Sequence, residues 1–210
     1  MIYMIIIGLT GGSGSGKGYV AGMFAARGIP ALDTDMVSRL VCAPGSDCLR
    51  ELAGHFGGGI IKTDGTLDRA ALAALAFSEK ENMAALNSIT HRHILAYCRK
   101  WLDERREDGC AAAIIDAPQL YESGFDAKCS AVVAVVADEA LRLKRILARD
   151  GITLSQAKLR LQRQRDDDFF RAHADYIIEN NFDENHPDNG ELLTQVDAVL
   201  HALGLAGDKP

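Results

Sequence analysis

The sequence predicts an α/β fold with a five-stranded parallel sheet, on the evidence of two features. Short runs of β-branched or small apolar residues recur along the chain, and stretches of helical pattern separate them in the manner of βαβ units. Parallel strands are covered by helices on both faces, so they have this uniformly apolar composition. The predicted strands are residues 3–9, 29–32, 112–115, 131–136 and 176–178.

The composition is that of one compact globular domain with insertions. The chain has 210 residues, of which 48% are hydrophobic and 25% charged. A net charge of −6 argues against a nucleic-acid binder, and no apolar run is long enough to cross a membrane. Five scattered cysteines without a CxxC pair are typical of a reducing compartment. We therefore expect a cytoplasmic protein, a monomer or weak homo-oligomer, that binds small molecules.

Two helical segments interrupt the predicted core. About eighty residues separate the second strand from the third, far more than an ordinary connection needs. Helical patterns at 70–77 and 82–106 predict a helical insertion that offers an acceptor pocket, and an Arg-rich stretch at 138–174 predicts a helical lid. The predicted core is 1–35, 111–137 and 175–203, the insertion 36–110, the lid 138–174 and a disordered tail 204–210.

A glycine-rich loop follows the first strand and satisfies the G-x-x-x-x-G-K part of the Walker A pattern. In such a loop the backbone N–H groups surround phosphate and the lysine meets the β and γ phosphates. The fold class is therefore P-loop nucleotide-kinase-like, with ATP as the expected co-substrate. The residues expected to bind ATP here are Gly12, Ser13, Gly14, Ser15, Gly16, Lys17, Gly18 and Tyr19.

Gly18 departs from the pattern, because a Ser or Thr hydroxyl at this position normally ligates the Mg²⁺ that accompanies the nucleotide. Phosphate binding by the backbone and Lys17 does not need that hydroxyl. Either water or an aspartate replaces the missing ligand, or the chain has lost turnover and only binds its ligands.

Carboxylates follow the second and third strands, at the sheet edge where α/β proteins bind ligands. Asp33 and Asp35 come at the end of the second strand, where one can act on an acceptor hydroxyl and the other can hold metal-bound water, or either can cap the next helix. Asp116 ends the third strand, as a Walker B carboxylate does, and either holds the metal through water or is structural.

The chain resembles the dephospho-CoA kinase family along nearly its whole length. The resemblance includes the loop, Asp33-Thr34-Asp35 with Arg39, and a particular Asp-Gly-Thr-Leu-Asp-Arg stretch at 64–69. It continues with His91, an Asp-Ala-Pro-Gln-Leu-Tyr-Glu stretch at 116–122, Arg145, Arg149-Asp150, Gln164 and the segment 174–180.

This resemblance implies a kinase that transfers the ATP γ-phosphate to the ribose 3′-hydroxyl of dephospho-CoA, with Mg²⁺. It implies that Asp35 is the base, that Arg145 reaches the transferring phosphates from the lid, and that Asn180 lies near the adenine. By the same matching, Arg149 contacts ATP, whereas Thr10, Arg39, His91, Pro118 and Leu120 contact the acceptor. A nucleoside or nucleotide kinase of the same fold remains the alternative.

Three further positions depart from the family pattern: Arg92, Gln119 and Phe182, where the family usually has proline, an apolar residue and glycine. Phe182 matters most, because Phe tolerates positive φ poorly in the loop expected beside the adenine. The other lid arginines, Arg142 among them, are expected on a solvated face, and the acidic run 166–168 is expected to be a solvated turn.

Overall fold

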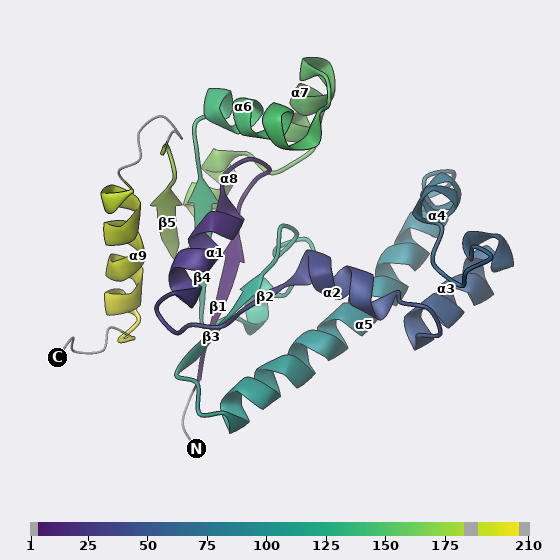
Figure 1. Cartoon of the computed structure of the whole chain (residues 1–210), viewed down its shortest axis with the longest axis horizontal. Coiled ribbons are helices and arrows are strands. Elements are labelled where there is room, and N and C mark those ends of the chain that lie inside the picture. Colours follow the sequence, from purple (N-terminus) through teal and green to yellow (C-terminus); the bar gives the residue numbers. More distant parts are fainter. Residues whose placement is uncertain (1–3, 183–188, 206–210) are drawn as a thin grey trace. The chain divides into compact units, whose positions relative to one another are not determined.

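A computed structural model describes residues 4–182 and 189–205 of the chain. It has a single five-stranded sheet in the order β2-β3-β1-β4-β5 (Figure 1). Parallel pairing joins β1 to β3, β1 to β4, and β4 to β5. The strands are β1 (Ile5–Thr10), β2 (Ala31–Asp33), β3 (Ala112–Asp116), β4 (Ala131–Val136) and β5 (Tyr176–Glu179). The predicted sheet is confirmed.

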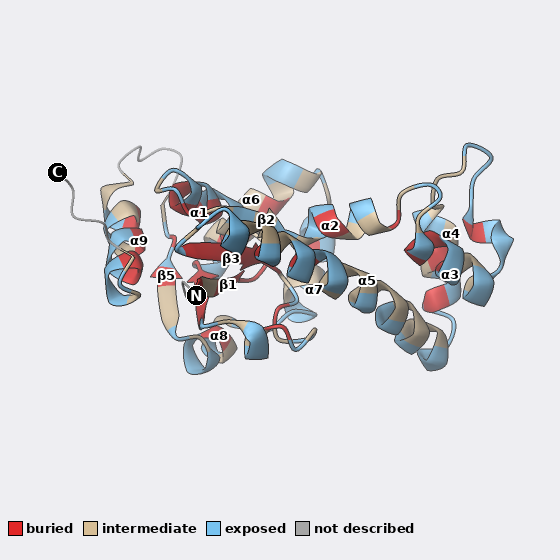
Figure 2. Ribbon diagram, turned by 90° about the horizontal axis from the view of Figure 1, so that it is seen from below, coloured by how far each residue is buried: buried red, intermediate tan, exposed pale blue. Residues whose placement is uncertain are grey.

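The central strands are buried on both faces, as their apolar composition predicts (Figure 2). Helices α1 (Lys17–Ala25) and α9 (Gly190–Ala202) contribute to the main core, which includes Phe24, Ile114, Val133 and Val196. On β4, Ala134 and Val136 instead join Phe170 of α8 (Asp167–His173) in a separate cluster. Alternate residues of β4 therefore enter two different cores.

The predicted lid, residues 138–174, contains α6 (Glu139–Asp150), α7 (Leu154–Gln162) and α8. Gly151 ends α6 in the left-handed conformation, and Thr153 opens α7 with a capping box to Gln156. These caps explain why the segment divides into separate helices.

The chain divides into two compact units, Met1–Leu32 with Arg106–Pro210, and Asp33–Arg105. The second unit, like the predicted insertion, is mainly helical. Predicted helices 70–77 and 82–106 correspond to α4 and α5. The elements of this unit are α2 (Thr34–Val41), α3 (Asp47–Phe56), the 3-10 turn η1 (Gly58–Ile60), α4 (Arg69–Ala76) and α5 (Lys80–Glu107, whose last residues belong to the first unit).

The Asp-Gly-Thr-Leu-Asp-Arg stretch of the second unit builds a turn and a helix start. The Asp64 carboxylate accepts hydrogen bonds from the Thr66 N–H and hydroxyl at 2.9 and 2.6 Å, and Gly65 takes φ of 82°. Asp68 then caps α4 by accepting from two backbone N–H groups at 3.0 Å. Local folding chemistry thus accounts for the polar residues of this motif.

Within residues 4–182 and 189–205, every helix is too short or too polar to span a bilayer. The predicted tail begins at Gly204, but the Leu205 N–H still donates to the Leu200 carbonyl at 2.8 Å and Leu205 packs against the core. The remainder of that predicted tail, 206–210, lies outside the described residues.

Candidate active site

The glycine-rich loop connects β1 to α1 in the first unit, as expected. Gly14 and Gly16 have φ of 80° and 83°, which L-residues with side chains rarely adopt. The Ser15 N–H donates to the Gly12 carbonyl at 3.1 Å, and α1 begins at Lys17. The loop therefore leads directly into a helix N-terminus, the arrangement that binds phosphate in proteins.

Lys17 forms an ion pair with Asp116 at the end of β3. Leu9 and Asp116 are paired in register, so the two strands deliver loop and carboxylate to the same edge of the sheet. The side chains are only 15% and 8% exposed. Asp116 thus holds the loop lysine in place, a contact that the sequence did not predict.

Arg142 of α6 lies beneath the loop, and the expectation that it faces solvent is wrong. It is 6% exposed, and its Nε donates to the Ser13 carbonyl at 3.0 Å. Its Nη1 also pairs with Asp167 of α8 at 2.8 Å. Burial raises the pKa of Asp167, although the charge of Arg142 opposes that shift. A Cβ at Gly12 would collide with the Arg142 guanidinium, which explains the glycine there.

Gln164, which follows α7, contacts the backbone of Ser13, whose carbonyl binds Arg142. Its Oε1 accepts a hydrogen bond from the Ser13 N–H at 2.8 Å. The resemblance includes Gln164 but gives it no role, and hydrophobic periodicity says nothing about a polar residue in a connection. The segment 138–174 therefore fixes Ser13 through both its carbonyl and its N–H.

Arg145, expected to reach the transferring phosphates, donates instead to the loop carbonyls of Gly14 and Ser15 at 3.1 and 3.3 Å. It also donates to the carbonyls of Asn180 and Phe182 at 3.1 and 2.6 Å. In this structure Arg145 therefore connects the phosphate loop to the segment after β5, and its role toward phosphate stays a prediction.

Asn180, expected near the adenine, is 2% exposed and donates from Nδ2 to the Ser15 carbonyl at 2.7 Å. A Cβ at Gly16 would collide with this amide group. Asn180 thus supports the loop from the side of β5, and any contact with adenine stays a prediction.

Two aromatic residues, Tyr19 of α1 and Phe182 after β5, stack on each other. The rings of Tyr19 and Phe182 lie 6.2 Å apart and nearly parallel, and the Tyr19 hydroxyl accepts from Asn189 at 2.9 Å. Among the described residues only glycines have positive φ, so Phe182 keeps an ordinary backbone. The strain expected from replacing the family's glycine is absent at this residue.

Arg149 forms a bidentate ion pair with its neighbour Asp150, at 2.7 and 3.0 Å. Together with a second pair from Arg160, this contact lowers the pKa of Asp150 from its ordinary value of 3.8 to about 2. Arg149 therefore engages a carboxylate of its own helix, and its predicted contact with ATP stays untested.

Leu120, expected to contact the acceptor, is fully buried, and a Cβ at Gly8 would lie 2.7 Å from its methyl carbon. Leu120 packs in the core of the first unit, and its contact with the acceptor stays a prediction. Pro118 is half-buried. The hydroxyls of Thr10 and Ser15 are also enclosed, and neither has a hydrogen-bond partner within the described part of the chain.

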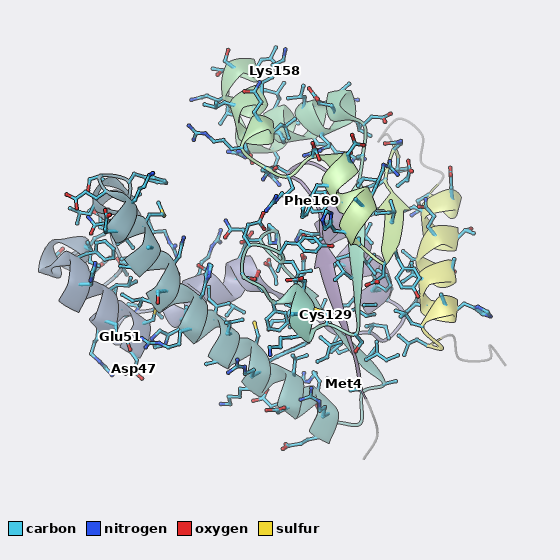
Figure 3. All side chains as sticks on the ribbon, turned by 180° about the vertical axis from the view of Figure 1, so that it is seen from behind. Met4, Asp47, Glu51, Cys129, Lys158 and Phe169 are labelled. Carbon is cyan, nitrogen blue, oxygen red and sulfur yellow. The ribbon has the colours of Figure 1, made fainter. Side chains whose placement is uncertain are left out.

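Tyr121 and Glu122 connect the stretch 116–122 to the lid. The Tyr121 ring meets Phe169 of α8, which is labelled in Figure 3, in an edge-on geometry with ring centroids 5.2 Å apart. Glu122 pairs with Arg165 at 3.2 Å, and Arg165 lies 4.3 Å from the centroid of the Phe169 ring. Burial raises the pKa of Tyr121 to about 12, so this hydroxyl stays protonated at neutral pH.

The remaining predicted site residues belong to the second unit. Asp33 caps α2 by accepting from the Asp35 N–H at 2.8 Å, so it does cap the helix, and its role toward a metal stays a prediction. Asp35 and Arg39 are exposed on α2, and His91 is half-buried on α5. Arg92, which stands where the family usually has proline, continues α5 without a break and pairs with Glu51 of α3.

A parallel sheet with a glycine-rich loop, a loop lysine and a strand-end carboxylate defines a P-loop kinase. Solved structures show the same fold. The fold matches a Thermus thermophilus protein with a TM-score of 0.81 at 27% identity, over 98% of this chain and 100% of that one. It also matches a Campylobacter jejuni dephospho-CoA kinase with a TM-score of 0.68 at 23% identity, over 94% and 96% of the two chains.

Sequence comparison narrows the class to one family. Residues 5–185 match the family model described as dephospho-CoA kinase. A dephospho-CoA kinase of Corynebacterium glutamicum is 39% identical over 92% of this chain and 98% of its own. The chain belongs to the dephospho-CoA kinase family, and it is a kinase that uses ATP.

Proposed function

We propose that this chain transfers the γ-phosphate of MgATP to the ribose 3′-hydroxyl of dephospho-CoA, giving CoA and ADP. The match to the family model over residues 5–185 carries the proposal. The loop with Lys17 and Asp116 supplies the phosphate chemistry that such a reaction needs.

The nucleotide half of the proposal rests on groups that are already oriented. Lys17 stands at the start of α1 and is held by Asp116. Hydrogen bonds from Arg142, Arg145 and Asn180 to consecutive loop carbonyls, those of residues 13–15, fix the conformation of the loop around the proposed phosphate site. Because phosphoryl transfer depends mainly on positioning and charge neutralisation, a loop held in this way favours catalysis.

The acceptor half rests on the second unit. Asp35 is the proposed base that accepts the proton of the ribose 3′-hydroxyl as the phosphoryl group is transferred. Its carboxylate is exposed, and its backbone N–H is held by Asp33, so α2 starts at a defined residue. Arg39 of the same helix and His91 of α5 are the proposed acceptor contacts.

The oxygen donors fit Mg²⁺, which prefers carboxylate and phosphate oxygens and retains several waters. Asp116 offers a carboxylate beside Lys17, and Asp33 is a second candidate. Gly18 offers no hydroxyl, so Asp116 is the residue we propose to hold the ion, through water. A Mg²⁺ ion held there would supply positive charge that offsets the charge developing on the phosphates during transfer.

We further propose a cytoplasmic enzyme that acts as a monomer or weak homo-oligomer. All five cysteines are free thiols, which agrees with a reducing compartment.

A coupled ADP-release assay tests the proposal. With MgATP and dephospho-CoA we expect steady ADP production, and mass spectrometry should identify CoA as the second product. ATP binding without ADP release above the acceptor-free background would contradict it, and would indicate that the absence of a hydroxyl at Gly18 has abolished turnover.

A further inference from the structure

Two of the five cysteines lie against each other in the core of the second unit. Cys42 ends α2, and Cys48 lies in the first turn of α3. Their Sγ atoms are 3.7 Å apart, and the residues are 6% and 1% exposed. In Figure 3 the labels Asp47 and Glu51 mark α3, the helix that carries Cys48. The pair is therefore a defined dithiol that the phosphotransfer chemistry does not use.

The turn between the two cysteines brings them together. Gly45 adopts φ of 76°, the Ser46 N–H donates to the Ala43 carbonyl at 3.1 Å, and the Ser46 hydroxyl accepts from the Leu49 N–H at 3.2 Å. These contacts fix the end of α2 beside the start of α3. A disulfide requires the sulfurs to approach to about 2.0 Å. From 3.7 Å this requires a shift of under two ångströms, which small side-chain rotations and backbone adjustment can supply.

The surroundings lower the pKa of Cys42 below that of an ordinary thiol. A hydrogen bond from Cys48 and the charge of Arg69 lower the pKa of Cys42 to about 7, although its burial opposes the shift. Burial raises the pKa of Cys98 to about 11 and that of Cys129 to about 12. Cys42 is therefore the thiol of the pair whose pKa is lowered, and Cys48, with its sulfur 3.7 Å away, is within reach to resolve an oxidised sulfur.

We propose that Cys42 and Cys48 form a redox-active dithiol that a peroxide oxidises to an intramolecular disulfide. The Cys42 thiolate attacks one oxygen of hydrogen peroxide and breaks the O–O bond, which gives a sulfenic acid and hydroxide. Cys48 then attacks the sulfenic sulfur, its proton leaves with the displaced hydroxide as water, and the S–S bond forms. In total two thiols and one peroxide give one disulfide and two waters, with sulfur oxidised and peroxide oxygen reduced.

The sequence offers a direct measurement of this reaction. Trypsin cuts after Arg39 and Arg50, so both cysteines fall in the single peptide 40–50. Cys98, Cys110 and Cys129 fall in the peptides 93–99, 107–128 and 129–142, which serve as internal controls. The full-length protein is reduced, desalted, exposed to graded hydrogen peroxide, quenched with N-ethylmaleimide and digested without reductant.

We expect peptide 40–50 to lose the mass of two hydrogen atoms and to take up no N-ethylmaleimide. This change should occur at peroxide concentrations that leave the three control peptides alkylated, and dithiothreitol should reverse it. Two N-ethylmaleimide groups on peptide 40–50, at doses that already oxidise a control peptide, would overturn the proposal. Sulfinic acid on Cys42 beside an alkylated Cys48 would also overturn it.

Two variants sharpen the test. Cys48→Ser removes the resolving thiol, so the sulfenic acid on Cys42 should persist and be trapped by dimedone. Cys98→Ser is the matched control, because it removes another buried cysteine of the second unit and should still form the disulfide. Thermal melting checks that both variants fold, and the wild-type result decides the proposal even where a variant does not.

Discussion

The two units differ in how far the polar residues of the proposed site are buried. In the first, the phosphate loop is held by buried groups, with Arg142 and Asn180 only 6% and 2% exposed. In the second, the proposed acceptor residues Asp35 and Arg39 are exposed on α2. A loop held by buried groups suits the phosphates of ATP, the co-substrate that kinases of this class share, whereas exposed side chains suit a larger acceptor that brings its own contacts. We therefore expect substitutions in the two units to separate nucleotide binding from acceptor chemistry.

Asp35→Asn provides the largest expected effect. A positioned general base contributes roughly 10²–10⁴-fold to the rate, so kcat should fall by roughly 10² or more, whereas ATP affinity should change only a few-fold. Steady-state kinetics and calorimetric ATP binding measure the two quantities. Asp33→Asn is the matched control, because asparagine still caps α2. It should weaken the apparent Mg²⁺ affinity and leave acceptor KM nearly unchanged. The same kinetic profile for both variants would contradict the proposed division of roles.

Asp167→Asn tests the support of the loop. The substitution removes the charge that pairs with buried Arg142 at 2.8 Å. Removing one partner of a buried ion pair typically costs about 3–5 kcal/mol. The Asp167 side chain is 28% exposed and therefore partly solvated, so we expect a cost below the upper part of that range. We expect a lower midpoint in urea unfolding and weaker ATP binding, because Arg142 also holds the Ser13 carbonyl. ATP affinity equal to that of the wild type would show that the pair only stabilises the fold.

Gly18→Ser tests the metal site with a smaller change. No atom lies within 4 Å of a Cβ built at Gly18, so the serine fits without rearrangement. The restored hydroxyl can ligate Mg²⁺, so half-maximal activity should need less free Mg²⁺, and kcat should rise with little change in acceptor KM. Glycine is also up to ~1 kcal/mol worse than a better helix former, so melting curves must accompany the kinetics. Unchanged Mg²⁺ dependence would mean that another group already fills this coordination position.

The smallest effect is expected from Asp150→Asn, at the last residue of the same helix that carries Arg142. The pKa of Asp150 is lowered from 3.8 to about 2, first by Arg149 and then by Arg160. A carboxyl group whose pKa is lowered by folding stabilises the native state above its unfolded pKa, and that contribution is lost as the pH falls toward the folded pKa. The variant should therefore melt slightly earlier than the wild type at pH 7, and the difference should shrink below pH 4. A difference that grows on acidification would contradict the assignment.

The sequence predicted the sheet and the loop because both rest on local patterns. Apolar runs identified all five strands, and the order of glycines and Lys17 located the phosphate loop. The burial of Arg142 could not be predicted, because it depends on α6 and α8 meeting at the loop. A helical pattern in the sequence gives the spacing of an arginine along its helix, but it does not show what the side chain packs against. Leu120 was assigned to the acceptor by matched position, which carries no information on burial, and the structure shows that its side chain is fully buried.

The contact between Cys42 and Cys48 was missed for a related reason. Cysteines six residues apart in sequence give no CxxC signal, and only the turn at 43–47 places their sulfurs 3.7 Å apart. Conversely, the Asp-Gly-Thr-Leu-Asp-Arg stretch was correctly seen as particular to a family, yet its polar residues build a turn and a helix cap. A distinctive motif can therefore serve local folding as well as chemistry.

The most direct test of the central claim compares acceptors side by side. Loop N–H groups bind phosphate and cannot sense what lies beyond it, so acceptor choice must come from elsewhere, and we propose the second unit. Values of kcat/KM should be measured for dephospho-CoA, adenosine, AMP and CMP under the same MgATP concentration. The proposed function predicts that dephospho-CoA exceeds the other three by a wide margin. A comparable kcat/KM for any of those three would contradict it.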